Sequence, residues 1–158
     1  MIEPMTSSNT PDLGRADVIP GFILSKPNFQ SRFDAEKEVV TRFMSEYATI
    51  LSGLPENLVR EGLMIGFQEV KYCGLREGAP ANLVWMKSTG MLPFLTWLSI
   101  KVKHPQITLE QTCKLFVDYN PDEIALATWQ LWGLISPEDK SVLHTDADAT
   151  PATEAAVV

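Results

Sequence analysis

The sequence has few residues of the kinds that bind metals or act as nucleophiles. Its two cysteines, Cys73 and Cys113, are forty residues apart, and so are its two histidines, His104 and His144. Neither pair has the spacing of a metal site or of a disulfide framework. The glycine loops that bind phosphate and the nucleophile elbow of hydrolases are also absent from the sequence. We therefore expect a protein that is not an enzyme and has no cofactor, although a triad built from distant residues would leave no such motif.

A net-basic region is also missing. The formal charge is −7, and the acidic excess lies mainly in the two ends of the chain, residues 1–28 and 136–158. Residues 120–135 contain no lysine or arginine and begin with Asp122 and Glu123. Readers of the major groove and of phosphates need such donors, so no nucleic-acid partner is expected.

Long apolar runs are scarce. The most apolar window, residues 81–100, is interrupted by Asn82, Lys87, Ser88, Gly90 and Pro93. A membrane-spanning helix needs about 20 largely apolar residues, so no membrane partner is expected. The N-terminus lacks a basic start followed by an apolar run, which predicts no secretory signal and a cytoplasmic protein.

The sequence divides into three parts. Residues 1–28 contain four prolines and predict an extended, irregular arm, anchored on the core where Phe22 and Leu24 share one side. Residues 29–135 have helical periodicity and predict one helical domain. Residues 136–158 are rich in alanine, threonine and aspartate and predict a disordered acidic tail.

Two long helices are predicted in the first half of the domain. Apolar residues spaced by three and four predict a helix over 34–51, ended by Gly53. Pro55 suits the first turn of a second helix, whose apolar stripe comprises Leu58, Gly62, Leu63, Gly66, Phe67, Val70 and Gly74. Glycine inside a helix costs about 1 kcal/mol relative to alanine. Gly62 and Gly66 on this stripe therefore predict the close approach of a neighbouring backbone.

Shorter helices follow. Pro80 can open a third helix, and Gly90 with Pro93 predicts a break before a further helix that reaches Lys103. Thr108 and Gln111 form a capping-box pattern, and Asn120 with Pro121 marks the start of a last helix to Ile135. Strand signals are nearly absent, so the expected fold class is all-α, a bundle of about five helices.

The tryptophans of the last helix allow two interpretations. If Ile124, Thr128 and Leu131 face the core, Trp129 and Trp132 point partly elsewhere, because one narrow stripe cannot hold them all. Either this helix is buried on two sides, or it offers a tryptophan surface to a partner, where tryptophan is a common anchor. His104 is interpreted as a residue at a helix end that meets the negative end of the helix dipole.

Part of the C-terminal half resembles a known family. The segments "WLSIKVKHPQITLEQTCKLF" and "NPDEIALATWQLWG" combine a Trp-Leu helix end, a basic stretch, His-Pro, a Thr-Leu-Glu helix start and a closing helix. This order resembles the small helical tail assembly chaperones of long-tailed bacteriophages. The residues that carry the resemblance are Trp97, Leu98, His104, Pro105, Ile107, Thr108, Leu109 and Glu110. The proline-rich N-terminus and the glycines of the second helix depart from the family pattern.

The resemblance implies a small helical protein of the host cytoplasm without catalytic residues. Such a chaperone coats the long helical tape-measure protein until tail-tube subunits displace it. Apolar helix faces would bind this client, and Trp97, Trp129, Trp132 and Leu126 are the candidate partner-binding residues. The alternative is a structural virion or head-tail connection protein that forms a homo-oligomer through its N-terminal arm.

Overall fold

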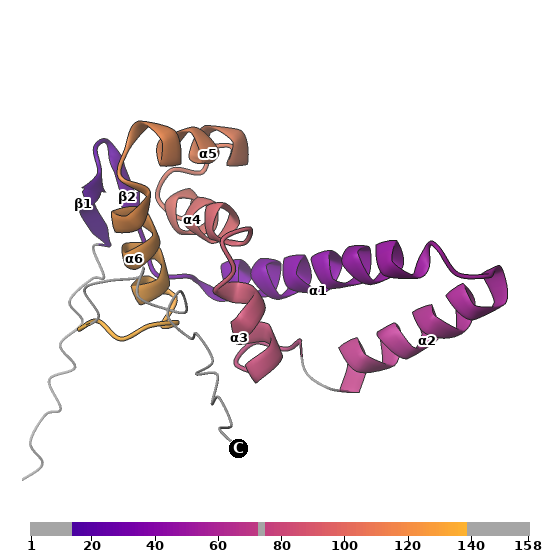
Figure 1. Cartoon of the computed structure of the whole chain (residues 1–158). Coiled ribbons are helices and arrows are strands. Elements are labelled where there is room, and N and C mark those ends of the chain that lie inside the picture. Colours follow the sequence, from indigo (N-terminus) through magenta and orange to yellow (C-terminus); the bar gives the residue numbers. More distant parts are fainter. Residues whose placement is uncertain (1–13, 73–74, 139–158) are drawn as a thin grey trace, which may run out of the picture.

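The computed structural model describes residues 14–72 and 75–138 (Figure 1). Within these ranges the chain forms six helices and one antiparallel pair of strands. A mostly helical fold is confirmed, but the all-α prediction and the count of about five helices are corrected by these elements. Residues 1–13 and the acidic tail from 139 onward, with Cys73, Gly74 and His144, lie outside the described residues.

The N-terminal segment folds into a β-hairpin. Strands β1 (Arg15–Ile19) and β2 (Phe22–Leu24) pair antiparallel, with Ile19 opposite Phe22. Pro20 and Gly21 make the turn, and Gly21 has a φ of 82°, a left-handed conformation that glycine adopts without strain. Ile19 and Leu24 are fully buried, so the expected anchoring is found, but the segment is a paired hairpin and not a single extended strand.

Two long helices form a second hairpin, which extends from one side of the molecule in Figure 1. Helix α1 (Phe29–Leu51) begins five residues before the predicted position because the Asn28 side chain caps it, accepting a hydrogen bond from Ser31 N at 2.8 Å. Helix α2 (Glu56–Tyr72) then runs back along α1. Arg32 and Glu36 of α1 hold the segment after α2 by binding the Glu77 carboxylate and backbone N–H, respectively.

The remaining helices are α3 (Pro80–Met86), α4 (Leu92–Lys101), α5 (Leu109–Asp118) and α6 (Pro121–Leu131). The predicted capping box of Thr108 and Gln111 is present, and Asn120 caps α6 by accepting from Asp122 N at 3.0 Å. The last helix ends at Leu131 and not at Ile135. The cause is Gly133, whose φ of 69° turns the chain out of the helix.

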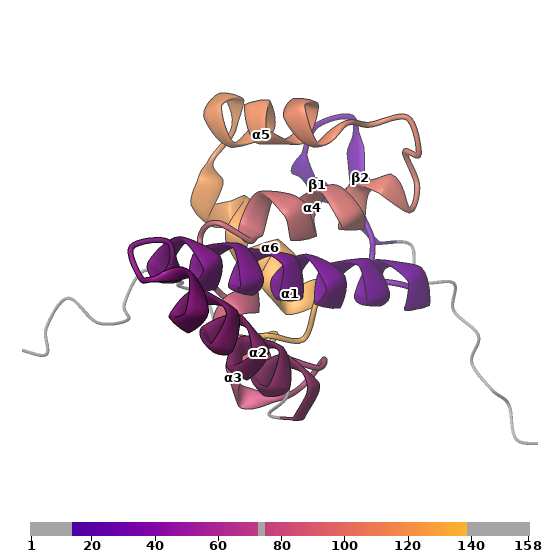
Figure 2. The same cartoon turned by 90° about the vertical axis from the view of Figure 1, so that its right-hand side faces the viewer.

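Helix α4 lies at the centre of the molecule, between α5 and α1 (Figure 2). One core cluster joins it to α1 and α3, and a second joins it to the β-hairpin, α5 and α6. A buried hydrogen bond of 2.9 Å between the Thr96 and Thr128 hydroxyls links α4 to α6. In the described part of the chain, no helix is long and apolar enough to cross a membrane.

Candidate partner-binding surface

Trp129 of α6 and Trp132, which directly follows the helix, are buried. Trp132 is 5% exposed, and its indole N–H donates to Ser99 Oγ at 2.9 Å. Trp129 is 9% exposed and packs with Leu92 and Ala125. Helix α6 is therefore buried on two sides, the first of the two interpretations of its sequence, and it leaves little tryptophan surface for a partner.

The other two candidate residues also belong mainly to the fold. Trp97 is half-buried between the two core clusters, and its indole N–H donates to the Ile107 carbonyl at 2.9 Å. Lys101 Nζ lies 4.4 Å from the centre of the same ring. Leu126 is half-buried on α6. Trp97 and Trp132 contribute to one core cluster and Trp129 to another.

His104 holds the β-hairpin against the end of α4. Its backbone N–H donates to the Ile100 carbonyl at 2.9 Å, as expected for a helix-end residue. Its Nε2 accepts a hydrogen bond from Ile23 N at 3.0 Å, and its ring meets the Phe22 ring edge-on at 5.3 Å. No local sequence signal predicts this contact, because Ile23 and His104 lie 81 residues apart.

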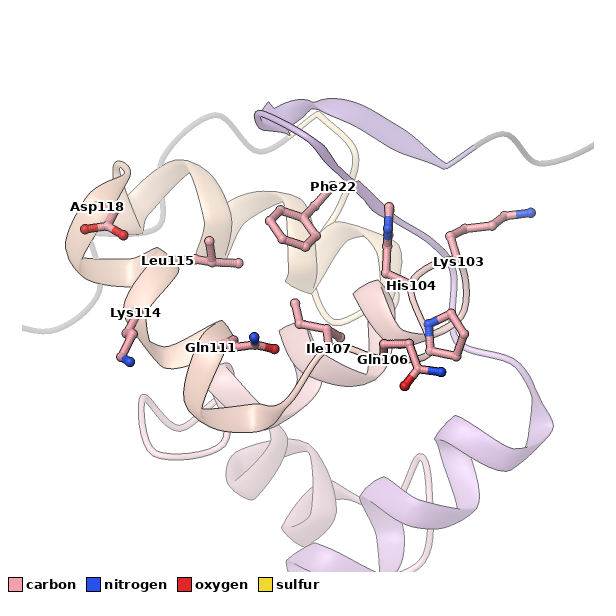
Figure 3. Close-up of a pocket in the computed structure, with 10 residues that line it drawn as sticks. Phe22, Lys103, His104, Gln106, Ile107, Gln111, Lys114, Leu115 and Asp118 are labelled. Atoms are coloured by element: carbon pink, nitrogen blue, oxygen red, sulfur yellow. The ribbon is translucent and has the colours of Figure 1, made fainter.

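A groove lies beside His104 (Figure 3). It has a volume of about 600 Å³, and Phe22, Ile107 and Leu115 supply its apolar wall. Lys103, Lys114 and Asp118 supply charges of both signs at its edges. It holds no nucleophile with a base, and no cluster of three or more metal-binding side chains occurs in residues 14–72 and 75–138.

The most exposed apolar segment is instead on the helical hairpin. Four apolar side chains of α2 are solvent-exposed: Leu58 (43%), Met64 (61%), Ile65 (50%) and Phe67 (62%). At the tip of the hairpin, Ile50 and Leu54 are exposed as well. Exposed large apolar residues concentrated in one segment, unlike scattered ones, are typical of interaction sites.

The face by which α2 packs on α1 differs from the predicted stripe. Its less exposed residues are Val59, Gly62, Leu63, Gly66 and Val70. The predicted stripe placed Leu58 and Phe67 on this face, whereas the structure leaves both exposed at its two margins. The run "LMIGF" could have revealed this surface, because it holds more bulky side chains than one helix face can bury.

The expected role of the two glycines is also corrected. A Cβ on Gly62 would lie 2.7 Å from Leu51 Cδ2, and a Cβ on Gly66 would lie 2.7 Å from Tyr47 Cδ1. The close neighbours are thus bulky side chains of α1 and not a backbone. Gly62 and Gly66 leave the space that these two side chains occupy.

The exposed flanks of α2 differ in charge. Glu61, Ile65 and Glu69 are four residues apart and form a line along one side of the helix. Leu58, seven residues before Ile65, lies on the same side. Arg60 and Met64 lie on the opposite flank, together with Phe67. Glu56, four residues before Arg60, is on this second flank as well. We call these surfaces the acidic flank (Leu58, Glu61, Ile65, Glu69) and the mixed-charge flank (Glu56, Arg60, Met64, Phe67).

Comparisons of the chain with protein-family models, with curated proteins and with solved structures found no match.

Proposed function

We propose that this protein is a non-catalytic tail assembly chaperone of a long-tailed bacteriophage. In this proposal it works in the host cytoplasm and shields apolar helices of a tape-measure-like client. The observation that carries the proposal is the exposed apolar surface of α2, and the family resemblance supplies the kind of client. The client is placed on the α1–α2 hairpin and not on Trp129 and Trp132, because these two side chains are buried.

The shape of the hairpin suits a helical client. Helix α2 packs chiefly on α1, so its two flanks are free of other elements over most of its length (Figure 1). An amphipathic helix can lay an apolar stripe of side chains spaced by three, four and seven residues against such a surface. The apolar residues of the client and of α2 would then be buried against each other. This burial stabilises the complex by about 25 cal/mol per Å² of apolar area removed from water.

The alternative is a structural connection protein that joins neighbouring subunits through its arm. The described part of the arm weighs against it, because Ile19 and Leu24 of the β-hairpin are buried in their own chain. His104 and Ser99 also accept hydrogen bonds from the backbone N–H groups of Ile23 and Ser25. This segment would have to leave its own core before it could join a neighbouring subunit.

The test is a tagged pull-down from phage-producing cells, with co-purifying proteins identified by mass spectrometry. We expect a long helical, tape-measure-like protein to be recovered together with the tagged chain. The tagged chain should be absent from finished particles. A Met64→Ser, Ile65→Ser, Phe67→Ser variant should lose this client. Val117→Ser is the control, because Val117 is an apolar residue on α5, outside the hairpin, that is even more exposed than these three. Recovery of the protein as a stoichiometric part of finished particles would favour the structural alternative.

A further inference from the structure

The acidic flank of α2 carries unpaired negative charge beside exposed apolar side chains. Glu61 and Glu69 are both solvent-exposed, and neither makes an ion pair within residues 14–72 and 75–138. They are eight residues apart, which is about 12 Å along a helix. Ile65 lies between them, and Leu58 lies one heptad before it. Glu69 also lines a small cavity with Phe43, Leu75 and Ala81, so this flank faces the α3 side of the hairpin.

We infer that the acidic flank binds a cationic amphipathic helix, with lysine or arginine side chains beside its apolar stripe. The inference rests on the proposed function and adds the charge of the client. Apolar residues of the client would cover Leu58 and Ile65, while its cations would lie beside Glu61 and Glu69. The net charge of the whole chain, −7, favours the approach of the same kind of partner.

A second copy of the chain fits this flank poorly. In a two-fold dimer built on the acidic flank, Glu61 and Glu69 of one copy would face the same residues of the other, and like charges across an interface are unfavourable. An anionic helix meets the same repulsion. Of these partners, a cationic helix alone matches both the apolar residues and the charge of this surface.

The experiment uses the full-length protein and two synthetic helical peptides. Both peptides have the same leucine stripe at helical spacing, and the flanking positions are lysine in one and glutamate in the other. Fluorescence anisotropy measures the affinity of each peptide at low and at high salt. We expect the lysine peptide to bind at least tenfold more tightly at low salt, with a smaller difference at high salt because ions screen exposed charges.

Charge-reversal variants locate the peptide on the protein. Glu61→Lys with Glu69→Lys should remove the preference for the lysine peptide, and Glu61→Gln with Glu69→Gln should weaken it. Asp118→Lys with Glu138→Lys is the matched control, because it makes the same change in net charge at exposed positions outside the hairpin. This control should keep most of the preference. Circular dichroism checks that each variant retains its helices.

The outcomes separate this inference from the proposed function. If both peptides bind equally well and Ile65→Ser weakens both, the charge inference is overturned while helix binding by the hairpin stands. If the control variant loses the preference as strongly as the Glu61 and Glu69 variant, binding follows overall charge and the assigned flank is wrong. If light scattering shows a dimer that the peptides dissociate, the surface belongs to a second copy. If neither peptide binds, the inference fails and the proposed function loses its binding surface.

Discussion

Helices α4 and α2 are both rich in apolar residues, but the fold uses them in opposite ways. Helix α4 contacts α1, α5, α6 and β2, and its buried residues extend over more than half of its circumference: Leu92, Leu95, Thr96, Leu98, Ser99 and Ile100. Helix α2 packs chiefly on α1 and leaves Leu58, Met64, Ile65 and Phe67 exposed. Figure 2 shows α4 between α5 and α1, and Figure 1 shows α2 at the edge of the molecule. The stability of the fold therefore depends on α4, and α2 is free to serve another purpose.

Truncation of one side chain in each helix gives the largest expected difference. Leu95 is fully buried in α4, so Leu95→Ala should lower the free energy of unfolding by about 2–5 kcal/mol, through lost burial and a cavity. Met64→Ala on α2 should change it by less than about 0.5 kcal/mol, because Met64 is solvent-exposed. Urea denaturation followed by circular dichroism measures both values. Equal losses would contradict the assignment of stability to α4.

The two buried tryptophans of the C-terminal half allow a finer comparison. The Trp132 indole N–H donates to Ser99 Oγ, whereas the buried Trp129 indole N–H has no partner within the described part of the chain. Trp132→Phe should therefore destabilise the protein by about 1–3 kcal/mol more than Trp129→Phe does, because it leaves Ser99 without its donor. The two changes remove the same atoms and serve as controls for each other. A larger loss at Trp129 would show that its N–H is satisfied in solution.

The contact between His104 and the β-hairpin gives a local prediction. His104→Ala removes the acceptor of the Ile23 N–H and the ring that packs on Phe22, so stability should fall by about 1–2 kcal/mol. Hydrogen exchange measured by NMR should show faster exchange at Ile23. Amides of α1 and α2 should be less affected, because the hydrogen bonds and the ring contact of His104 in the described part of the chain involve neither helix. If amide exchange became equally faster throughout the protein, the β-hairpin would open only when the whole protein unfolds, and the local role of His104 would be contradicted.

The smallest expected effect concerns the exposed pair in β1. Arg15 donates hydrogen bonds to both carboxylate oxygens of Asp17, at 3.2 and 2.9 Å, and this lowers the pKa of Asp17 below 3.8. A carboxyl whose pKa is lowered by folding contributes stability above its unfolded pKa, and that contribution disappears as the pH falls through the folded value. The effect is small because both side chains are largely in water. NMR titration of the Asp17 carboxyl should show the lowered pKa, and Arg15→Gln should return it toward 3.8.

Local signals predicted the helix starts well. The capping box at Thr108 and the side-chain cap at Asn120 involve residues within three positions of each other, so the sequence alone contains the complete interaction. The start of α1 was placed too late even though local signals for it are present. Asn28 is a cap residue, and Phe29 and Phe33 continue the helical spacing that leads to Val40. Both phenylalanines are nevertheless exposed in the structure.

Interactions between distant segments were not predictable from the same signals. The pairing of β1 with β2 is held by burial of Ile19 and Leu24 against helices that follow much later in the chain. The burial of Trp129 and Trp132 depends on α4 and on the segment after α6 in the same way. Helical periodicity gives the direction of a side chain, but it does not tell which directions other elements cover. The candidate residues were therefore sought on α4 (Trp97) and in and after α6 (Leu126, Trp129 and Trp132), whereas the exposed apolar surface lies on α2.

The glycines of α2 have one more consequence. Leu51 and Tyr47 occupy the spaces at Gly62 and Gly66, so a rotation of α2 about its axis would bring larger side chains against them. The two helices are therefore locked in one register, and the direction of each outer side chain of α2 is set before a partner arrives. Binding to this surface would not have to order α2 first, so little affinity would be lost to conformational entropy. If a client binds as proposed, the hairpin would offer it a preorganised surface whose shape depends on Gly62 and Gly66, two residues on the opposite, inner face of α2.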